Sequence, residues 1–257
     1  MNSSDEATIA KIISQYFSPR DTQLSDETVC EVLAQELIRS YHNQTCIVTL
    51  TAAPASGKQV FSEALMQKLR DLGHSIDAID TDDFVKYTRE ERYGRLAEGM
   101  PVIDKYAFDY LNKIVQYARE GKTIQAPIYN EATGEAFAIG EDKFPHTIPA
   151  GLHFLLVTGD FQPVPDPDLR IYLHVPTDIR RANRVERDLQ KRGVSDAEGI
   201  KKSFDERLAT QYYPYTLPQA EKADILLVVT PKQPEKGSSY RVKYEYSTYV
   251  RKQDMLA

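Results

Sequence analysis

The sequence predicts a three-layer α/β/α fold, in which helices cover both faces of a mostly parallel sheet of five strands. Two observations lead to this expectation. Apolar runs of strand length alternate with helical patterns along most of the chain, which is the order of repeated strand–helix–strand units. Most of these runs are apolar throughout rather than at every second residue, as is typical of strands buried on both faces. The expected strands are 46–51, 75–80, 153–158, 169–175 and 224–229.

Helical patterns fill the intervals between these strands, at 60–72, 107–120, 177–191 and 197–212. Two more, around 9–17 and 28–41, predict an N-terminal helical extension over residues 1–45, and a cap signal at 25–27 begins the second. Segment 124–144 has short β pieces broken by proline and glycine, and we expect it to cross the sheet edge. The main domain is expected over 46–230, and residues 231–257 should form a linker and one strand or a hairpin.

Composition excludes several classes of protein. The chain has 257 residues, of which 41% are hydrophobic, so it can bury a full core. A net charge of −6 argues against a general nucleic-acid binder. Cys30 and Cys46 give neither a disulfide framework nor a metal-ligand spacing. The polar N-terminus and the lack of a long apolar run predict a cytoplasmic protein without membrane contact, and homo-oligomer formation is left open.

A candidate phosphate-binding loop follows the first strand. Small residues there would let backbone N–H groups close around an anion, and the next helix would add its positive N-terminal end. Lys58 would reach the β- and γ-phosphates of a nucleotide. The strict pattern has Gly in place of Ala52 and Ser or Thr in place of Gln59, so an ordinary strand–turn–helix connection is the alternative. The residues expected around the phosphates are Ala53, Pro54, Ala55, Ser56, Gly57, Lys58 and Gln59.

An acidic turn follows the second strand and contains Asp80, Asp82 and Asp83. Ligands of open parallel sheets bind beyond the carboxyl ends of the strands, and the phosphate-binding loop lies at that same edge. Phosphoryl transfer to a hydroxyl uses one carboxylate to deprotonate the nucleophile and others to hold Mg²⁺. A solvated acidic turn that caps a helix is the alternative.

The expected helix after the fourth strand carries a stripe of basic side chains. Arg180, Arg184, Arg187 and Lys191 are spaced by four, three and four residues, which places them on one helix face. Arginine suits phosphate binding because its planar fork is always charged, so the helix over 177–193 could form a lid above a nucleotide. The alternative is a solvated face with acidic partners on the same helix.

From about residue 46 to 229, these features resemble the uridine kinase/phosphoribulokinase group of P-loop kinases. Segment 183–193 is similar to the lid signature of that family, Arg-Arg-x-x-Arg-Asp-x-x-x-Arg-Gly, and residues 82–84 resemble its Asp-Ser-Phe turn. Segments 107–109 and 121–129 resemble its Ala-Phe-Asp and Gly-Lys-x-x-x-x-Pro-x-Tyr motifs. The resemblance implies a P-loop NTPase fold, with ATP and Mg²⁺ as cofactors.

The resemblance also implies roles for particular residues. Asp82 would be the catalytic base, and Lys58 would hold the transferred phosphoryl group. Arg187 and Arg192 would contact the ATP phosphates and close over the reacting centre. The acceptor would contact Asp82, Tyr129 and Arg184.

Two departures from the family pattern concern the metal. Gln59 replaces the hydroxyl residue that binds Mg²⁺, and Thr158 stands where the family has an acidic residue. Asp83 and Asp160 are the candidate metal ligands in their place. Motifs specific for uridine are missing around 103–106 and 133–135, so a pyrimidine nucleoside is not the favoured acceptor.

We therefore expect ATP-dependent phosphoryl transfer to a hydroxyl of a small metabolite, such as a nucleoside, a sugar or a vitamin-like compound. The residues at positions 59 and 158 support an alternative, a nucleotide-binding regulatory or scaffold protein that has lost turnover. A P-loop transferase other than a kinase is a third, weaker hypothesis.

Overall fold

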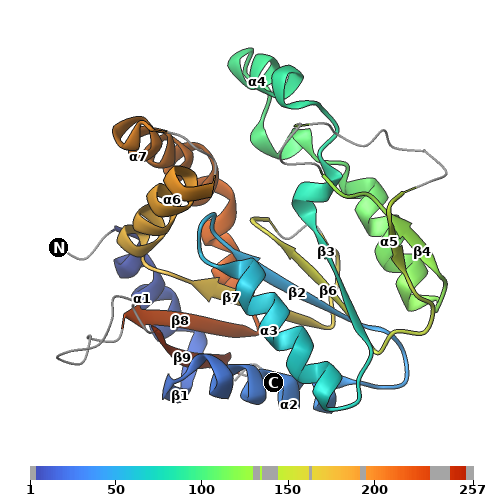
Figure 1. Cartoon of the computed structure of the whole chain (residues 1–257). Coiled ribbons are helices and arrows are strands. Elements are labelled where there is room, and N and C mark those ends of the chain that lie inside the picture. The colour runs from blue at the N-terminus through green and yellow to red at the C-terminus, as the bar shows by residue number, and fades with distance from the viewer. Residues whose placement is uncertain are drawn as a thin grey trace.

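The computed structural model describes residues 4–129, 134, 144–161, 164–191, 195–231 and 244–252. Within them, the α/β fold is confirmed: a seven-stranded sheet of order β1-β9-β8-β7-β2-β6-β3 lies between two layers of helices (Figure 1). Five of these strands run parallel and form the centre of the sheet. They are β3 (Ile76–Asp80), β6 (Phe154–Gly159), β2 (Cys46–Ala52), β7 (Leu169–His174) and β8 (Ile225–Pro231).

The expectation of a five-stranded sheet is wrong, because two further strands extend it. β9 (Tyr244–Arg251) pairs antiparallel with β8, and β1 (Phe17–Leu24) pairs antiparallel with β9. β1 is mostly polar and contains Pro19, which an edge strand tolerates because one of its sides needs no partner. It therefore lacks an apolar signal. Its pairing with β9 brings the first and last described segments of the chain into one sheet.

Helices α2 (Asp26–Ser40) and α3 (Lys58–Asp71) cover one face of the sheet. The expected cap signal is present, since the hydroxyl of Ser25 accepts a hydrogen bond from the backbone N–H of Thr28. Buried side chains such as Leu33 and Leu65 pack against β2, β7 and β8. This packing forms the larger part of the core and holds α3 directly behind the loop that precedes it.

The opposite face is covered in two parts. α5 (Phe108–Arg119) packs against β2, β3 and β6, while α1 (Ser4–Tyr16) and α7 (Ala197–Arg207) pack around Tyr172 of β7 and Leu226 of β8. α6 (Thr177–Lys191) leaves the end of β7 and lies above this edge beside α7 (Figure 1). Helix α1 of the N-terminal extension and the helices of the lid region therefore meet on the same side of the sheet.

Two helical segments differ from expectation. The helix expected over 197–212 ends at Arg207 and continues as a π-helical segment η3 (Leu208–Thr216) and a 3₁₀ segment η4 (Leu217–Lys222). Pro214 lacks a backbone N–H and cannot continue an α-helix. The helix α4 (Arg89–Ala97) was not expected, because it buries no side chain and shows no apolar stripe. Its signal is the capping box of Thr88 and Glu91.

The connections near the sheet edges complete the fold. Short 3₁₀ turns η1 (Thr81–Phe84) and η2 (Val102–Lys105) flank α4, and β4 (Ile124–Ala126) pairs with β5 (His146–Ile148). Most of the expected excursion at 130–143 and most of the expected linker at 232–243 lie outside the described residues. In the described part of the chain, no helix is long and apolar enough to span a membrane.

Candidate active site

Three chain segments meet at the carboxyl edge of the parallel strands. Thr158 of β6 lies in register with both Leu50 of β2 and Asp80 of β3. The loop after β2, the acidic turn after β3 and the residue after β6 therefore leave the sheet together. Gly159 allows the closest approach, because a Cβ at this position would collide with the side chain of Thr81.

The loop after β2 has the backbone shape of an anion-binding loop. Ala55 and Gly57 both have positive φ values, of 65° and 75°. Gly57 is the N-cap of α3 and provides no side-chain acceptor, so no side chain caps the first N–H groups of that helix. Asn183 of α6 donates a hydrogen bond to the carbonyl of Ala55 at 3.2 Å. The loop is therefore tied to the expected lid helix.

Lys58 forms an ion pair with Asp160. Its Nζ lies 2.8 Å from Oδ1 of Asp160, and each side chain is 14% exposed. Burial acts to lower the pKa of Lys58, but the carboxylates of Asp160, Asp80 and Asp82 act more strongly together and raise it. The ammonium group therefore stays charged and points toward the acidic turn.

Asp82 is held by two hydrogen bonds. Its Oδ1 accepts from the hydroxyl of Tyr106 at 2.9 Å, and its backbone N–H donates to Oδ1 of Asp80 at 2.9 Å. The other oxygen of Asp80 accepts from the hydroxyl of Thr158 at 2.7 Å. Burial raises the pKa of Asp80, partly offset by Lys58. The hydroxyl of Thr158 thus supports the acidic turn from the neighbouring strand.

Asp83 fixes the backbone at Tyr129, the residue expected to contact the acceptor. Its Oδ1 accepts from the backbone N–H of Tyr129 at 2.8 Å, and Arg92 donates to the hydroxyl of Tyr129 at 3.1 Å. Burial raises the pKa of Asp83 to about 7, although the bond from Tyr129 opposes the shift. In this structure the Asp83 carboxylate thus braces the backbone at Tyr129, and its expected role as a metal ligand stays a prediction.

The lid arginines share one acidic partner. Nε of Arg184 lies 2.7 Å from Asp188, and Nε of Arg187 lies 3.1 Å from the other oxygen of that carboxylate. Nη2 of Arg187 is buried and has no hydrogen-bond partner among the described residues, so a phosphate oxygen would satisfy it only after the side chain moves to expose it. Arg192, the other arginine expected to contact ATP, lies outside the described residues.

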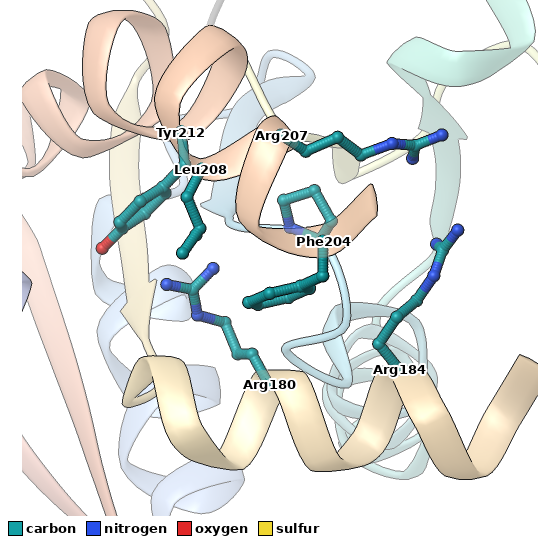
Figure 2. A pocket seen from close by; sticks show the side chains of 7 residues that line it. Arg180, Arg184, Phe204, Arg207, Leu208 and Tyr212 are labelled. Carbon is teal, nitrogen blue, oxygen red and sulfur yellow. The ribbon is translucent and has the colours of Figure 1, made fainter. Parts of the chain in front are cut away.

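A cavity lies between the phosphate-binding loop, α6 and the segment formed by α7 and η3 (Figure 2). Arg184 from α6 and Arg207 from α7 extend along one side of it, while Phe204 and Tyr212 form an aromatic wall. Pro54 contributes the loop side. Positive charge from two helices therefore borders the loop.

The sequence reasoning missed Lys105, on which Asp82 acts, and two arginines that act on Lys105 in turn. The ammonium group of Lys105 lies 4.7 Å from the ring centre of Tyr106, which itself binds Asp82. Burial lowers the pKa of Lys105, and the charges that act on it are Asp82, Arg92, Asp160 and Arg207. Within the described ranges, Lys105, Arg92 and Arg207 form no ion pair. Arg92, Lys105 and Arg207 are far apart in the sequence, so no motif joined them.

The side chains near Lys58 can contribute to a magnesium site only together with a nucleotide. No group of three His, Cys, Asp or Glu residues in the described part of the chain could hold a metal ion alone. Mg²⁺ bound to nucleotides commonly takes only one or two carboxylates, and Asp160 beside Lys58 fits this use. The amide of Gln59 donates instead to Glu63 at 3.0 Å on the exposed side of α3.

The strand order and the lysine-bearing loop define a P-loop kinase fold. The D-glycerate 3-kinase of Cryptococcus neoformans superposes with a TM-score of 0.60 at 10% identity, covering 78% of this chain and 94% of that one. Residues 47–234 match the Phosphoribulokinase / Uridine kinase family. This chain therefore belongs to that family, which confirms the expected resemblance.

The similar proteins include both phosphoribulokinases and uridine kinases. The chain is 28% identical to the chloroplastic phosphoribulokinase of Chlamydomonas reinhardtii, over 88% of its own length and 64% of that protein. It is 24% identical to the uridine kinase of Borrelia turicatae, over 80% of its own length and 94% of that protein. The chain spans between 51% and 64% of three of the phosphoribulokinases that it matches.

Proposed function

We propose that the protein transfers the γ-phosphoryl group of ATP to a hydroxyl of a small metabolite that carries an anionic group. The observation that supports transfer is the Lys58–Asp160 pair beside an acidic turn, in which Asp82 is exposed, and an uncapped helix N-terminus. This combination places charge for a phosphate chain next to a carboxylate, Asp82, which is held in place by Tyr106.

The proposed reaction follows from these positions. The loop N–H groups and Lys58 bind the β- and γ-phosphates, and Arg187 contributes its unpartnered Nη2. The acceptor oxygen attacks the γ-phosphorus, its proton passes to Asp82, and the bond to the β–γ bridging oxygen breaks to release ADP. Asp160 is the residue that would help to hold Mg²⁺, which would supply positive charge to offset that of the phosphates.

The anionic acceptor is supported by Arg92, Lys105 and Arg207. Each is of intermediate exposure, and none has an ion-pair partner in the described residues, so each keeps a charge that an anionic ligand could neutralise. Asp82 acts electrostatically on Lys105, and so do Arg92 and Arg207, which places all three cations within reach of Lys105 on the side of Asp82 where the acceptor hydroxyl would lie. A phosphate or carboxylate on the acceptor would neutralise these charges, whereas a neutral nucleoside would not.

A second candidate is a nucleotide-binding regulatory or scaffold protein without turnover. Gln59 favours it, because its amide bonds to Glu63 rather than facing the phosphate-binding loop. This hypothesis keeps the ATP site but assigns no reaction to Asp82.

An ADP-release assay on matched acceptors tests the proposal. Each pair would consist of a neutral metabolite and its phosphorylated or carboxylated counterpart, such as a pentose and a pentose phosphate, or glycerol and glycerate. We expect turnover of an anionic member only. Lys105→Met should raise the KM for that acceptor by about tenfold, the scale of one charged hydrogen bond, with kcat little changed.

Lys113→Met is the matched control, because Lys113 lies on the distant part of α5 above the ring of Tyr117. It should leave both constants unchanged. Preferred turnover of a neutral nucleoside would contradict the anionic acceptor. ATP binding without turnover of any acceptor would favour the regulatory alternative.

A further inference from the structure

A buried ion pair joins the N-terminal helix to the base of the lid helix. Asp5 of α1 is 0% exposed and Arg180 of α6 is 1% exposed. Oδ2 of Asp5 accepts hydrogen bonds from Nη2 of Arg180 at 3.3 Å, from the hydroxyl of Thr177 at 2.5 Å and from the hydroxyl of Tyr212 at 3.5 Å. One carboxylate oxygen thus connects α1, α6 and η3.

The guanidinium of Arg180 extends this connection to the sheet and the aromatic wall. Its Nε donates to the carbonyl of Val175, directly after β7, at 2.9 Å. Its central carbon lies 4.2 Å from the ring centre of Tyr212, and Figure 2 shows the group below that ring in the cavity. Arg180 is therefore fixed on several sides, but Asp5 is its charged partner.

Neither charge can remain in this place without the other. An ion held away from water costs several kcal/mol unless a partner and further hydrogen bonds compensate it. If Asp5 loses its charge, Arg180 must move toward solvent or draw another anion into the cavity. Either response displaces the first turn of α6, because Thr177 begins that helix and also bonds to Asp5.

The first turn of α6 determines where its later residues lie. Asn183, one turn further on, donates to the loop carbonyl of Ala55, and Arg184 and Arg187 follow on the same helix. A helix transmits a displacement of its first turn along its axis, since its backbone hydrogen bonds keep it rigid. The position of the lid arginines over the loop therefore depends on a residue outside the matched segment 47–234.

We propose that Asp5 is a positioning residue for nucleotide phosphates, which acts through Arg180 and the first turn of α6. The proposal rests on the proposed ATP site. It assigns a role in phosphate binding to the N-terminal helix, beyond its contribution of Ile9 and Ile12 to the core.

Calorimetric affinities for ATP and AMP test this role in the full chain. Asp5→Asn keeps the size of the side chain but removes its charge. We expect it to weaken ATP binding by about tenfold, a typical coupling between two sites, while AMP binding changes by less than about twofold. The two ligands must differ because the lid arginines face the β- and γ-phosphates, which AMP lacks. A contribution to stability alone would leave the ratio of the two affinities unchanged.

Two further variants separate this role from a failure to fold. Asp178→Asn removes the same charge from the exposed side of the same helix turn, and its ATP to AMP ratio should match that of the wild type. Asp5→Asn combined with Arg180→Met leaves no unpaired charge, so it decides the matter if Asp5→Asn alone does not fold. It should fold and still lack the preference for ATP, because neither Asp5 nor Arg180 then ties the first turn of α6 to α1.

Wild-type discrimination between ATP and AMP in either Asp5 variant would overturn the positioning role while leaving the ATP site intact. A wild-type protein with no affinity for ATP would instead overturn the proposed function, and the positioning role with it. The two failures are therefore distinguishable.

Discussion

Gln59 and Thr158 occupy the two positions where the chain departs from the expected metal-binding pattern of its family, and each has a partner of its own. Gln59 donates to Glu63, and Thr158 donates to Asp80 at 2.7 Å. A glutamate at position 158 would lose this donated bond and bring a second negative charge beside Asp80, whose pKa burial already raises. The acidic turn is thus built around a hydroxyl at this position.

Restoring the family residues with Gln59→Ser and Thr158→Glu should therefore not raise the proposed phosphoryl transfer. We expect the double variant to lower turnover of its best acceptor, because the new carboxylate displaces Asp80 and with it Asp82. Asp160→Ala should abolish turnover, since Asp160 is the carboxylate beside Lys58. Steady-state rates at saturating ATP and Mg²⁺ measure both effects.

The opposite result identifies an inactive relative. If the wild type turns over slowly or not at all and the double variant is faster, the residues at 59 and 158 have cost the protein its activity. Gln67→Ser, on the exposed surface of α3, is a suitable control for the change at 59.

Residues that belong to one local motif could be predicted, and residues joined only by the fold could not. Lys58, Asp82 and Arg187 each stand in a recognisable stretch of sequence. Lys105 and Asp5 do not, because the roles proposed for them depend on contacts with segments far away in the chain. Spacing along one helix or strand carries no information about such contacts.

At the scale of elements, the central strands were predictable because both of their faces are buried. β2 and β6 are buried at every position, which gave each a continuous apolar run. β1 and α4 were missed because their stability has other origins. β1 depends on backbone pairing with β9, and α4 depends on its capping box. The sequence carries no sign of the backbone pairing that holds β1. It indicates the capping box of α4 only through Thr88 and Glu91.

The junction of α7 and η3 shows a different limit. The apolar pattern continues from Phe204 through Leu208 to Tyr212, so it predicted one helix. The backbone changes to a π-helix over this stretch and still buries the same side chains. The apolar pattern therefore predicted which residues are buried. It did not predict the π-helical backbone of this segment, which contains Pro214, a residue that an α-helix does not accommodate.

At the scale of the whole molecule, the buried His174 links stability to pH. It is 3% exposed, and burial lowers its pKa from 6.5 to about 4, with Asp5 opposing the shift and Arg180 adding to it. In the unfolded chain the imidazole takes up a proton as pH falls below 6.5, whereas in the folded chain it stays neutral until about pH 4. Unfolding is therefore increasingly favoured across this window.

We expect this group to remove roughly 3 kcal/mol of folding stability between pH 6.5 and 4, from 1.4 kcal/mol for each pKa unit. Urea unfolding of the wild type and of His174→Leu at several pH values measures the difference between their slopes. The slope should be flatter for His174→Leu. His42→Leu, at an exposed position, should reproduce the wild-type slope, and identical slopes in all three proteins would contradict a buried neutral His174.

The pairing of β1 with β9 also acts at this scale. It fastens the N-terminal helices to the parallel sheet, and Lys252 adds a backbone bond to the carbonyl of Tyr16. α1 is thereby held at the side of the sheet where Asp5 meets Arg180. The extension and the family segment consequently form one core.

The central claim is that Asp82 receives the acceptor proton while Lys58 and the lid hold ATP. The most direct measurement is the rate of ADP formation with the best acceptor, compared between the wild type and Asp82→Asn, together with calorimetric ATP affinity. We predict that kcat falls by roughly two to four decades, the usual range for a general base, while the dissociation constant for ATP changes by less than about twofold. Equal rates in the two proteins would contradict the assignment of Asp82 as the base.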